Sequence, residues 1–422
     1  MAIIDDDLTR RAAEFPCRID GPRGCVPILS LGSLPLANAL PRASELATVD
    51  ARYPLELVFS PSTTLVQIME TVPPEHLFGD YVYFSSFSDT MVEHARVLVE
   101  RLIARQRLDG SKRVVEVASN DGYLLQHYQR AGVAVLGVEP AANVAEVAVA
   151  KGIPTRVAFF GEECARALVT EGGQADVIHA HNVLAHVADL NGVVAGFATL
   201  LRDDGVLVVE VPYVKDMIDS VEFDTIYHEH LCYFSLTALV RLFARHGLIV
   251  DDVERVAIHG GTLRLFAAHE RGGRRAGPRT EALLEQEHAW GVDRPEFYRD
   301  FARRVETLKD SLVSLLSERK RAGRRIAAYG AAAKGAILLN YCGLGPELID
   351  FVADRSTYKQ GRFVPGVRLP IVAPARIVEH PAPDDLLLLA WNFADEIMAQ
   401  QHEFRRRGGQ FIVPVPTPHV VE

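Results

Sequence analysis

The chain has 422 residues, of which 48% are hydrophobic and 24% are charged. This balance is typical of a water-soluble globular protein, and at roughly 100–200 residues per domain the length predicts two to four domains. The 45 Lys and Arg residues against 55 Asp and Glu residues give a formal charge of −10. Since long basic runs are also lacking, we expect no general binding of nucleic acid and no binding to an anionic membrane.

The N-terminal segment and the cysteines indicate an intracellular protein. The first residues, MAIIDDDLTRR, are acidic, whereas a signal peptide begins with a basic region and an apolar run. The most apolar stretch, 386–391, is too short to span a bilayer. The five cysteines are scattered and odd in number, which favours reduced thiols over disulfides. We therefore expect a cytoplasmic enzyme, with a monomer as the default state.

Residues 1–75 contain frequent Pro and Gly and predict a small lobe of short strands and turns. Helical apolar spacing follows at 91–105. From Arg113 onward β-branched runs alternate with helical segments, which predicts a mostly parallel sheet with helices on both faces. The expected strands are 114–117, 133–138, 155–157, 176–178 and 205–211, and the expected helices are 121–132, 140–151 and 190–201. The runs 248–256 and 262–269 have no helix between them and predict an antiparallel addition to that sheet.

A second alternating unit begins at Arg325, after one or two long helices expected within 279–322. Its expected strands are 326–329, 348–353, 386–389 and 411–413, and its expected helices are 332–341 and 394–407. The predicted fold class is therefore α/β, with two Rossmann-like units and a small N-terminal lobe. We place the domains at 1–75, 76–275 and 323–422, with connecting helices at 276–322.

The turn ASNDG at 118–122 joins the first strand of the central sheet to the next helix. Nucleotides bind at such turns because the backbone approaches the ligand at the carboxyl end of the strand. The fingerprint G-x-G-x-x-G is absent, which weighs against NAD. An acidic strand residue, Glu116, followed by Asp-Gly suits a ligand with a cationic amino-acid end.

Polar residues also follow the neighbouring strands of this sheet. Glu139 ends the second strand, where an acidic side chain can bind both ribose hydroxyls, and Asn182 follows the fourth. Taken alone, Glu139 is better interpreted as a solvated strand end, and Asn182 as a turn former. With the first turn they predict S-adenosylmethionine (SAM) as cofactor. The expected cofactor-binding residues are Glu116, Ser119, Asn120, Gly122, Tyr123, Glu139, Pro140, Asn182 and Val183.

Four motifs occur in order: EVASNDG at 116–122, FDTIYHEH at 223–230, HGG at 259–261 and YGAAAKG at 329–335. In these motifs the chain resembles the TDP-4-keto-sugar C-methyltransferases, from about Cys17 to the C-terminus. The resemblance implies an N-terminal zinc-binding module, a central SAM-binding domain and a C-terminal Rossmann-like domain that helps to hold a nucleotide sugar.

The zinc module of that family has two Cys-x-x-Cys pairs, from which this chain departs. Cys17 is present, but Asp20, Ser60 and Thr63 stand at the other three matching positions. Hydroxyls are poor substitutes for thiolates as zinc ligands, and Cys25 lies at the wrong spacing. We therefore expect no zinc and no other metal, with the module kept as a lobe on the substrate side.

The stretch Tyr227-His228-Glu229-His230 gathers four polar side chains between apolar neighbours. The H-E-H spacing points helical imidazoles nearly opposite ways, so a metal site is the minor interpretation, and a buried loop with satisfied histidines is another. General acid/base chemistry fits better, because histidine accepts a proton near neutrality and tyrosine can stabilise an oxyanion. By resemblance Tyr227, His230 and His186 are active-site residues, and Glu229 could orient an imidazole or bind a sugar hydroxyl.

The remaining candidates concern the substrate. By resemblance Tyr81 and Tyr83 line the cleft, although simple strand or turn packing of aromatic residues explains them equally well. His259, which precedes two glycines, could face the sugar, although a tight turn with an exposed histidine is nearly as good an interpretation. Small residues at a helix start favour phosphate binding, with Lys334 as counter-charge and Tyr329 and Asn340 nearby. The predicted function is SAM-dependent C-methylation of a nucleotide-linked, TDP-type keto-deoxysugar. The alternatives are another acceptor on the same fold, an NAD-dependent nucleotide-sugar enzyme and a non-enzymatic binding protein.

Overall fold

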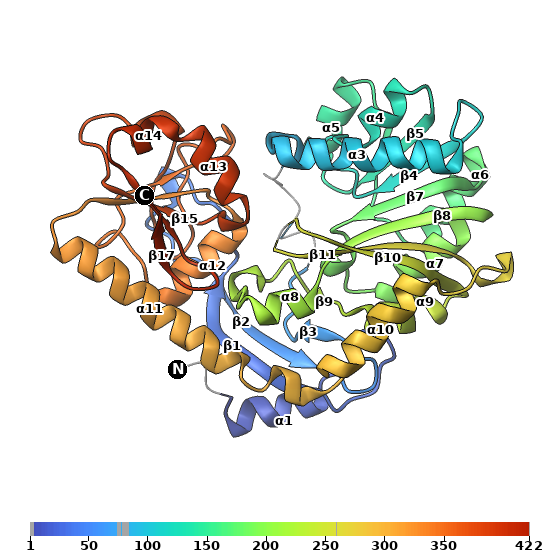
Figure 1. Cartoon of the computed structure of the whole chain (residues 1–422), viewed down its shortest axis with the longest axis horizontal. Helices are drawn as coiled ribbons and strands as arrows, with labels where there is room; N and C mark the ends of the chain where they lie inside the picture. Colours follow the sequence, from blue (N-terminus) through green and yellow to red (C-terminus); the bar gives the residue numbers. More distant parts are fainter. Residues whose placement is uncertain (1–3, 74–76, 78–83, 259, 422) are drawn as a thin grey trace.

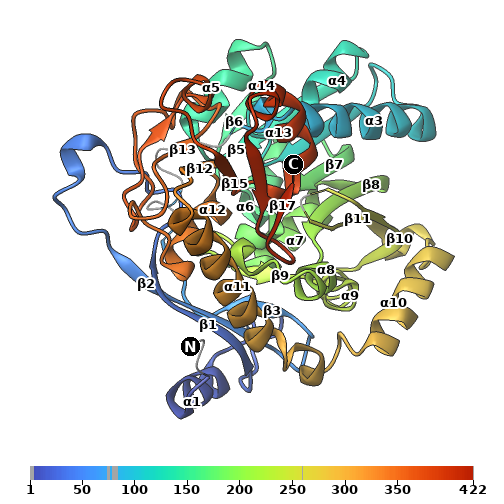
Figure 2. The same ribbon diagram turned by 60° about the vertical axis from the view of Figure 1, so that its left-hand side comes forward.

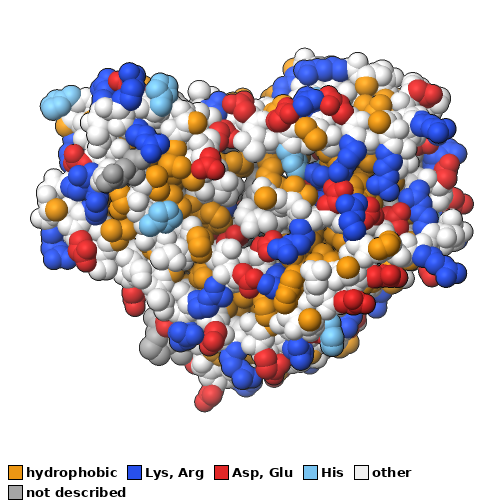
Figure 3. All heavy atoms as spheres, in the orientation of Figure 1, with side chains coloured by type: hydrophobic (Ala, Val, Ile, Leu, Met, Phe, Trp, Pro, Cys, Tyr) orange, Lys and Arg blue, Asp and Glu red, His pale blue; other side chains and the backbone are white. Residues whose placement is uncertain are grey.

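The computed structural model describes residues 4–73, 77, 84–258 and 260–421, which are arranged around three β-sheets (Figure 1). A C-terminal and a central unit form two upper lobes, and an N-terminal sheet lies below and between them. The molecular outline is notched between the upper lobes (Figure 3). Within the described ranges no helix has the length and apolarity needed to cross a membrane. The α/β fold with two Rossmann-like units and a small N-terminal lobe is confirmed.

The N-terminal sheet is antiparallel, with the order β1-β2-β3-β9. Its elements are β1 (Val26–Pro35), β2 (Arg52–Phe59), β3 (Val66–Ile68), β9 (Cys232–Tyr233) and α1 (Asp6–Glu14). The β1–β2 hairpin extends beside the C-terminal unit (Figure 2), where Phe363 N donates to the carbonyl of Pro41 at 2.9 Å. Strand β9 pairs with β3, and it follows the Tyr-His-Glu-His stretch of the central unit. The N-terminal sheet is therefore completed by a strand from the central unit.

The central sheet has the order β10-β11-β8-β7-β4-β5-β6, parallel except for β10 and β11. Its strands are β4 (Arg113–Val117), β5 (Ala134–Glu139), β6 (Thr155–Val157), β7 (Ala175–His181), β8 (Leu201–Pro212), β10 (Leu248–Val256) and β11 (Thr262–His269). Its helices are α3 (Asp89–Gln106), α4 (Leu125–Arg130), α5 (Ala142–Ala150), α6 (Glu162–Gly172), α7 (Leu190–Leu200), α8 (Val214–Asp219) and α9 (Leu236–Ala244). The predicted antiparallel addition is confirmed.

Helices α10 (Pro278–Trp290) and α11 (Phe301–Arg321) connect the central unit to the C-terminal one. The C-terminal sheet has the order β14-β13-β12-β15-β16-β17 and is parallel up to β16. Its strands are β12 (Ile326–Tyr329), β13 (Val352–Ala353), β14 (Ile371–Val372), β15 (Asp385–Leu388), β16 (Gln410–Val413) and β17 (His419–Val421). Its helices are α12 (Ala333–Cys342), α13 (Ala394–Gln400) and α14 (His402–Arg406).

Several expected elements differ from the structure in their bounds, three of them as follows. The helix expected at 121–132 begins only at Leu125, because Asn120 and Gly122 have left-handed φ values of 50° and 79° that no helix accommodates. The strand expected at 348–353 is reduced to Val352–Ala353. The helix expected at 394–407 is interrupted at Gln401, whose ψ of 29° departs from helical geometry.

Candidate active site

The loop after β4 has the backbone of a ligand-binding turn. Ala118, Asn120 and Gly122 all have left-handed φ values, between 50° and 79°. A Cβ atom at Gly122 would lie 2.3 Å from Cδ1 of Ile153, so a side chain at this position requires Ile153 or the loop to move. Because non-glycine residues rarely adopt this conformation, its clustering in one short loop indicates a functional constraint.

Two buried carboxylates flank this loop. Glu116 on β4 is 1% exposed, and its Oε2 atom has no hydrogen-bond partner among the described atoms. Burial, together with the charges of Glu139 and Asp121, raises the pKa of Glu116 well above its usual range. Glu139 at the end of β5 accepts hydrogen bonds from Asn120 N and Ala141 N, both at 2.9 Å. Glu139 therefore holds the loop, while Glu116 offers an unsatisfied acceptor.

Two serines just before α3 form hydrogen bonds to the same loop. Ser85 N donates to Oδ1 of Asn120 at 2.8 Å, and the Ser86 hydroxyl donates to Asp121. The other expected cofactor-binding residues follow β4, β5 and β7, which are adjacent and parallel, so they share one sheet edge. They are Ser119 and Tyr123, Pro140, and Asn182 and Val183.

Tyr227 and His230 form a hydrogen-bonded pair. Nδ1 of His230 lies 3.0 Å from the carbonyl oxygen of Thr225, which can only accept, so Nδ1 carries a hydrogen. In the neutral imidazole Nε2 is then an acceptor, and the Tyr227 hydroxyl donates to it at 2.7 Å. This tautomer, assigned from the hydrogen bonds, presents Nε2 as a base that shares a proton with a phenol.

Three neighbouring residues, His186, Glu229 and His228, surround this pair or bond to the N-terminal lobe. His186 packs edge-on against His230, with ring centroids 4.7 Å apart, and burial lowers its pKa to about 4. Glu229 accepts a 2.7 Å hydrogen bond from Nδ2 of Asn38, and burial raises its pKa to about 7. His228 donates to the carbonyls of Tyr53 and Pro54 in β2. Within this stretch Tyr227 and His230 bond to each other, whereas His228 and Glu229 bond to the N-terminal lobe.

The C-terminal unit reaches the site through α12 and the turn after β15. The Lys334 ammonium lies 4.3 Å from the centre of the Trp391 ring, and Trp391 Nε1 donates to Oδ2 of Asp224 at 2.7 Å. The hydroxyl of Tyr329 accepts from Gln401, and Asn340 donates to the carbonyls of Ala336 and Pro365. Tyr329 and Asn340 therefore already have partners within this unit.

Three predicted substrate residues, Tyr81, Tyr83 and His259, lie outside the described residues. Gly260 and Gly261, which follow His259, have φ values of 92° and 128°. A Cβ at Gly260 would lie 2.3 Å from the Glu222 carboxylate, and one at Gly261 would lie 2.3 Å from Asp216. The two glycines are therefore required by close packing against acidic side chains.

Comparison with known proteins gives matches along nearly the whole chain. Family models described as "Putative zinc binding domain", "Methyltransferase domain" and "C-methyltransferase C-terminal domain" match residues 17–78, 91–253 and 257–416. The C-methyltransferase NovU of Streptomyces niveus is 38% identical over 405 residues, which cover 96% of each chain. The chain belongs to the C-methyltransferase family. The resemblance inferred from the four motifs is confirmed, and with it the enzyme class, a SAM-dependent C-methyltransferase.

The similar solved structures cover a smaller share of this C-methyltransferase than NovU does. The magnesium protoporphyrin IX methyltransferase ChlM of Synechocystis PCC 6803 with bound SAM is 16% identical and covers 46% of this chain and 88% of its own, with a TM-score of 0.33. The PH0226 protein of Pyrococcus horikoshii OT3 is 13% identical and covers 47% of this chain and 100% of its own, with a TM-score of 0.36.

The residues at the zinc positions of this C-methyltransferase do not fit a structural zinc. Sγ of Cys17 lies 3.0 Å from Oγ1 of Thr63, at hydrogen-bonding distance, and the Ser60 and Ser62 hydroxyls are also 3.0 Å apart. Ser62 in turn donates to Asp20 at 3.2 Å. Burial raises the pKa of the nearby Cys25 thiol to about 11, which disfavours the thiolate that zinc requires. A hydrogen-bonded cluster stands at the positions where the resemblance implied thiolates.

We predict that the purified, untagged C-methyltransferase contains far less than one zinc per chain, because only one thiol remains at the four positions. Elemental analysis after dialysis measures this directly. A chelator is expected to leave the melting temperature unchanged. Stoichiometric zinc that survives dialysis would contradict the prediction.

A substitution at Gly122 is expected to weaken cofactor binding by about tenfold or more, which corresponds to roughly 1.4 kcal/mol. Gly122→Ala places a methyl group against Ile153, so that Ile153 or the loop must shift, and strains a residue with a φ of 79°. Gly132→Ala is the matched control, because Gly132 has nearly the same φ, 77°, and nothing within 4 Å of its Cβ position. Titration calorimetry with S-adenosylhomocysteine compares the two variants. Equal affinities would refute a loop-specific effect.

Some of the site residues carry no sequence signal. Asn38 lies in a loop of the N-terminal lobe and Trp391 in the C-terminal unit, both outside the four motifs, and Trp391 meets Asp224 from another unit. A buried chain of hydrogen bonds also runs from the Tyr128 hydroxyl through His179 and His181 to Glu210, with successive distances of 2.9, 2.9 and 3.1 Å. The sequence signal for this network is the spacing of His179 and His181, which are two residues apart and therefore lie on the same face of β7.

Proposed function

We propose that the protein transfers a methyl group from SAM to the carbon next to the ketone of a nucleotide-linked keto-deoxysugar, through an enolate. The observation that carries the proposal is the Tyr227–His230 pair, in which Nε2 of His230 is the acceptor. A carbon beside a ketone is a weak acid, so its methylation needs a base and stabilisation of the resulting oxyanion. An imidazole acceptor and a phenol provide these two functions in one hydrogen-bonded unit.

The cofactor-binding part of the proposal rests on the loop after β4. The unsatisfied carboxylate of Glu116 fits the ammonium end of SAM, and Gly122 gives the loop its left-handed turn while Ile153 packs against it. Glu139 keeps acceptor capacity for ribose hydroxyls beyond its two backbone bonds, because a carboxylate has about four acceptor sites. When bound, SAM supplies an electrophilic methyl group.

Proton transfer is assigned to His230. Its Nε2 atom takes up the proton next to the ketone, and the Nδ1 hydrogen bond to Thr225 keeps the imidazole in the required tautomer. The Tyr227 hydroxyl, which donates to Nε2 in the free protein, turns its hydrogen to the developing oxyanion and so frees Nε2 for the substrate proton, or it relays that proton. His186 is neutral at physiological pH, since its pKa is about 4, and so adds no charge that would oppose protonation of His230.

Glu229 and the C-terminal unit are assigned to the substrate. The pKa of Glu229, about 7, lets its carboxyl group either donate to or accept from a sugar hydroxyl near neutral pH. We assign Lys334 as the counter-charge for a pyrophosphate, and we assign Tyr81, Tyr83 and His259 to contact with the substrate. We assign Tyr329 and Asn340 a supporting role, because their polar groups bond within the C-terminal unit.

The function is tested by titration calorimetry with SAM and S-adenosylhomocysteine, repeated with TDP, GDP, CDP and UDP. The expected result is cofactor binding together with a preference for one nucleotide, TDP first. Incubation with SAM and the corresponding 4-keto-sugar should then give a product one methyl group heavier, with NMR placing the new group on carbon. Absence of SAM binding, or methylation of an oxygen or nitrogen, would overturn the proposal.

A further inference from the structure

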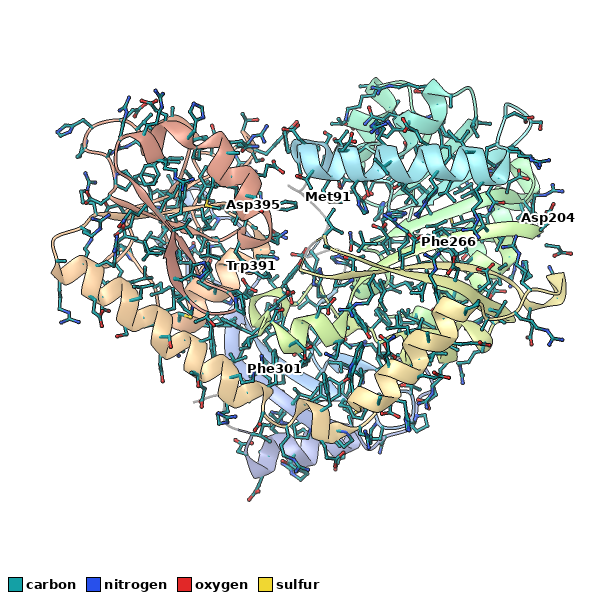
Figure 4. All side chains as sticks on the ribbon, in the orientation of Figure 1. Met91, Asp204, Phe266, Phe301, Trp391 and Asp395 are labelled. Atoms are coloured by element: carbon teal, nitrogen blue, oxygen red, sulfur yellow. The ribbon has the colours of Figure 1, made fainter. Side chains whose placement is uncertain are left out.

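We propose that Trp391 and Asp224 are positioning residues, which hold the segment that orients His230. The inference rests on the proposed role of His230 as the base. Trp391 lies in η8 (Trp391–Phe393) of the C-terminal unit, on the side that faces the central unit (Figure 4). Asp224 lies in η4 (Phe223–Thr225) of the central unit. The C-terminal unit would then organise the base as well as hold the substrate.

The bond between them is a strong constraint on η4. Nε1 of Trp391 donates to Oδ2 of Asp224 at 2.7 Å, and Asp224 is 0% exposed. A buried carboxylate tolerates the loss of a donor poorly, because no water replaces it. The indole ring is itself fixed beneath the Lys334 ammonium, at 4.3 Å.

The packing around η4 transmits this constraint. Phe223 stacks at a tilt on Tyr341 of α12, with ring centroids 5.3 Å apart, so the residue before Asp224 is also held by the C-terminal unit. Thr225, the residue after Asp224, presents the carbonyl that accepts from Nδ1 of His230 at 3.0 Å and from the Tyr233 hydroxyl at 3.4 Å. A shift of η4 therefore moves the acceptor that fixes the His230 tautomer.

The test compares the two tryptophans of the chain. Trp391→Phe removes the Nε1 donor and keeps an aromatic ring beneath Lys334. Trp290→Phe is the matched control: the Lys215 ammonium lies 4.5 Å from its ring centre, and Trp290 makes no hydrogen bond to a carboxylate within the described part of the chain. We expect Trp391→Phe to lower kcat by about 10- to 100-fold with an unchanged Kd for SAM, and Trp290→Phe to leave both unchanged.

Substitutions of Asp224 separate the hydrogen bond from the charge. Asp224→Asn keeps a carbonyl acceptor for the indole and should retain kcat within a few-fold of the wild type. Asp224→Ala should reproduce the loss seen in Trp391→Phe. If Asp224→Asn and Asp224→Ala lose activity equally, or if Trp391→Phe keeps the wild-type kcat, the positioning role is refuted.

A readout independent of turnover distinguishes this inference from the proposed function. Histidine-labelled protein examined by long-range ¹H–¹⁵N NMR reports the imidazole tautomer, with His230→Asn used to assign the signal. The Nδ1-protonated form should dominate in the wild type and in Trp290→Phe, and should be lost or mixed in Trp391→Phe. This NMR result without any methylation of keto-sugars would refute the function and leave the positioning role standing. An unchanged tautomer in Trp391→Phe would refute the positioning role alone.

Discussion

His230→Asn is expected to lower kcat by about 10²- to 10⁴-fold, the usual contribution of a general base. The asparagine amide can still donate to the Thr225 carbonyl in place of Nδ1, but nothing replaces the Nε2 acceptor. The variant should therefore keep its fold and its affinity for SAM while losing proton abstraction. Tyr227→Phe should have a smaller effect, because the imidazole base remains.

The proton-transfer step can be measured without methyl transfer. With S-adenosylhomocysteine bound, the wild type should exchange the hydrogen next to the ketone for solvent deuterium, which NMR of the substrate detects. His230→Asn should slow this exchange as much as it slows turnover. His288→Asn is the control, since the side chain of His288 is 77% exposed. Exchange at the wild-type rate in His230→Asn would transfer the role of base to another residue.

Glu116→Gln is expected to raise the Kd for SAM by about 10- to 150-fold, the equivalent of roughly 1.5–3 kcal/mol for a hydrogen bond to a charged group. The buried carboxylate has an unsatisfied oxygen that the cofactor ammonium would satisfy. In the free protein the same charge is unfavourable, as the raised pKa shows. The neutral variant should therefore bind SAM less tightly without unfolding at a lower temperature.

The pH dependence gives a second test of Glu116. A group whose pKa is raised on folding contributes stability when protonated, and this contribution is lost as the pH rises through the raised pKa. Binding of an ammonium needs the ionised form, so the affinity of the wild type for SAM should fall as the pH is lowered through that pKa. Calorimetry across pH should show a weaker dependence in Glu116→Gln. Parallel curves for the two proteins would exclude Glu116 from the cofactor site.

Local patterns in the sequence predicted the parts of the fold that depend on neighbouring residues. The β-branched run at 114–117 and the turn that follows it lie where the strand and loop of the central sheet were expected. The helix after the turn begins at Leu125, four residues later than the pattern predicts. A left-handed residue such as Asn120 costs little when the surrounding loop holds it in place, and composition alone does not show that it is held.

The candidate site was predicted only in part, for the same reason. Tyr227 and His230 are three residues apart, so their pairing follows from local geometry. The partner of Glu229 is Asn38, which is 191 residues away, and the partner of Asp224 is Trp391, which is 167 residues away. Neither partner belongs to a motif, and such contacts depend on how separate units pack.

The sequence by itself therefore determined the α/β class, the order of the units, the family and the short motifs that carry the chemistry. Periodicity and turn composition are local properties, and a single chain records them directly. The tertiary structure decided which imidazole nitrogen of His230 is the acceptor, where Glu229 and Asp224 find their partners, and what replaces thiolates near Cys17. The partners of Glu229 and Asp224 and the cluster near Cys17 arise from contacts between distant segments, which burial of the common core brings together. The His230 tautomer depends on the conformation of its own short loop, which composition alone does not specify.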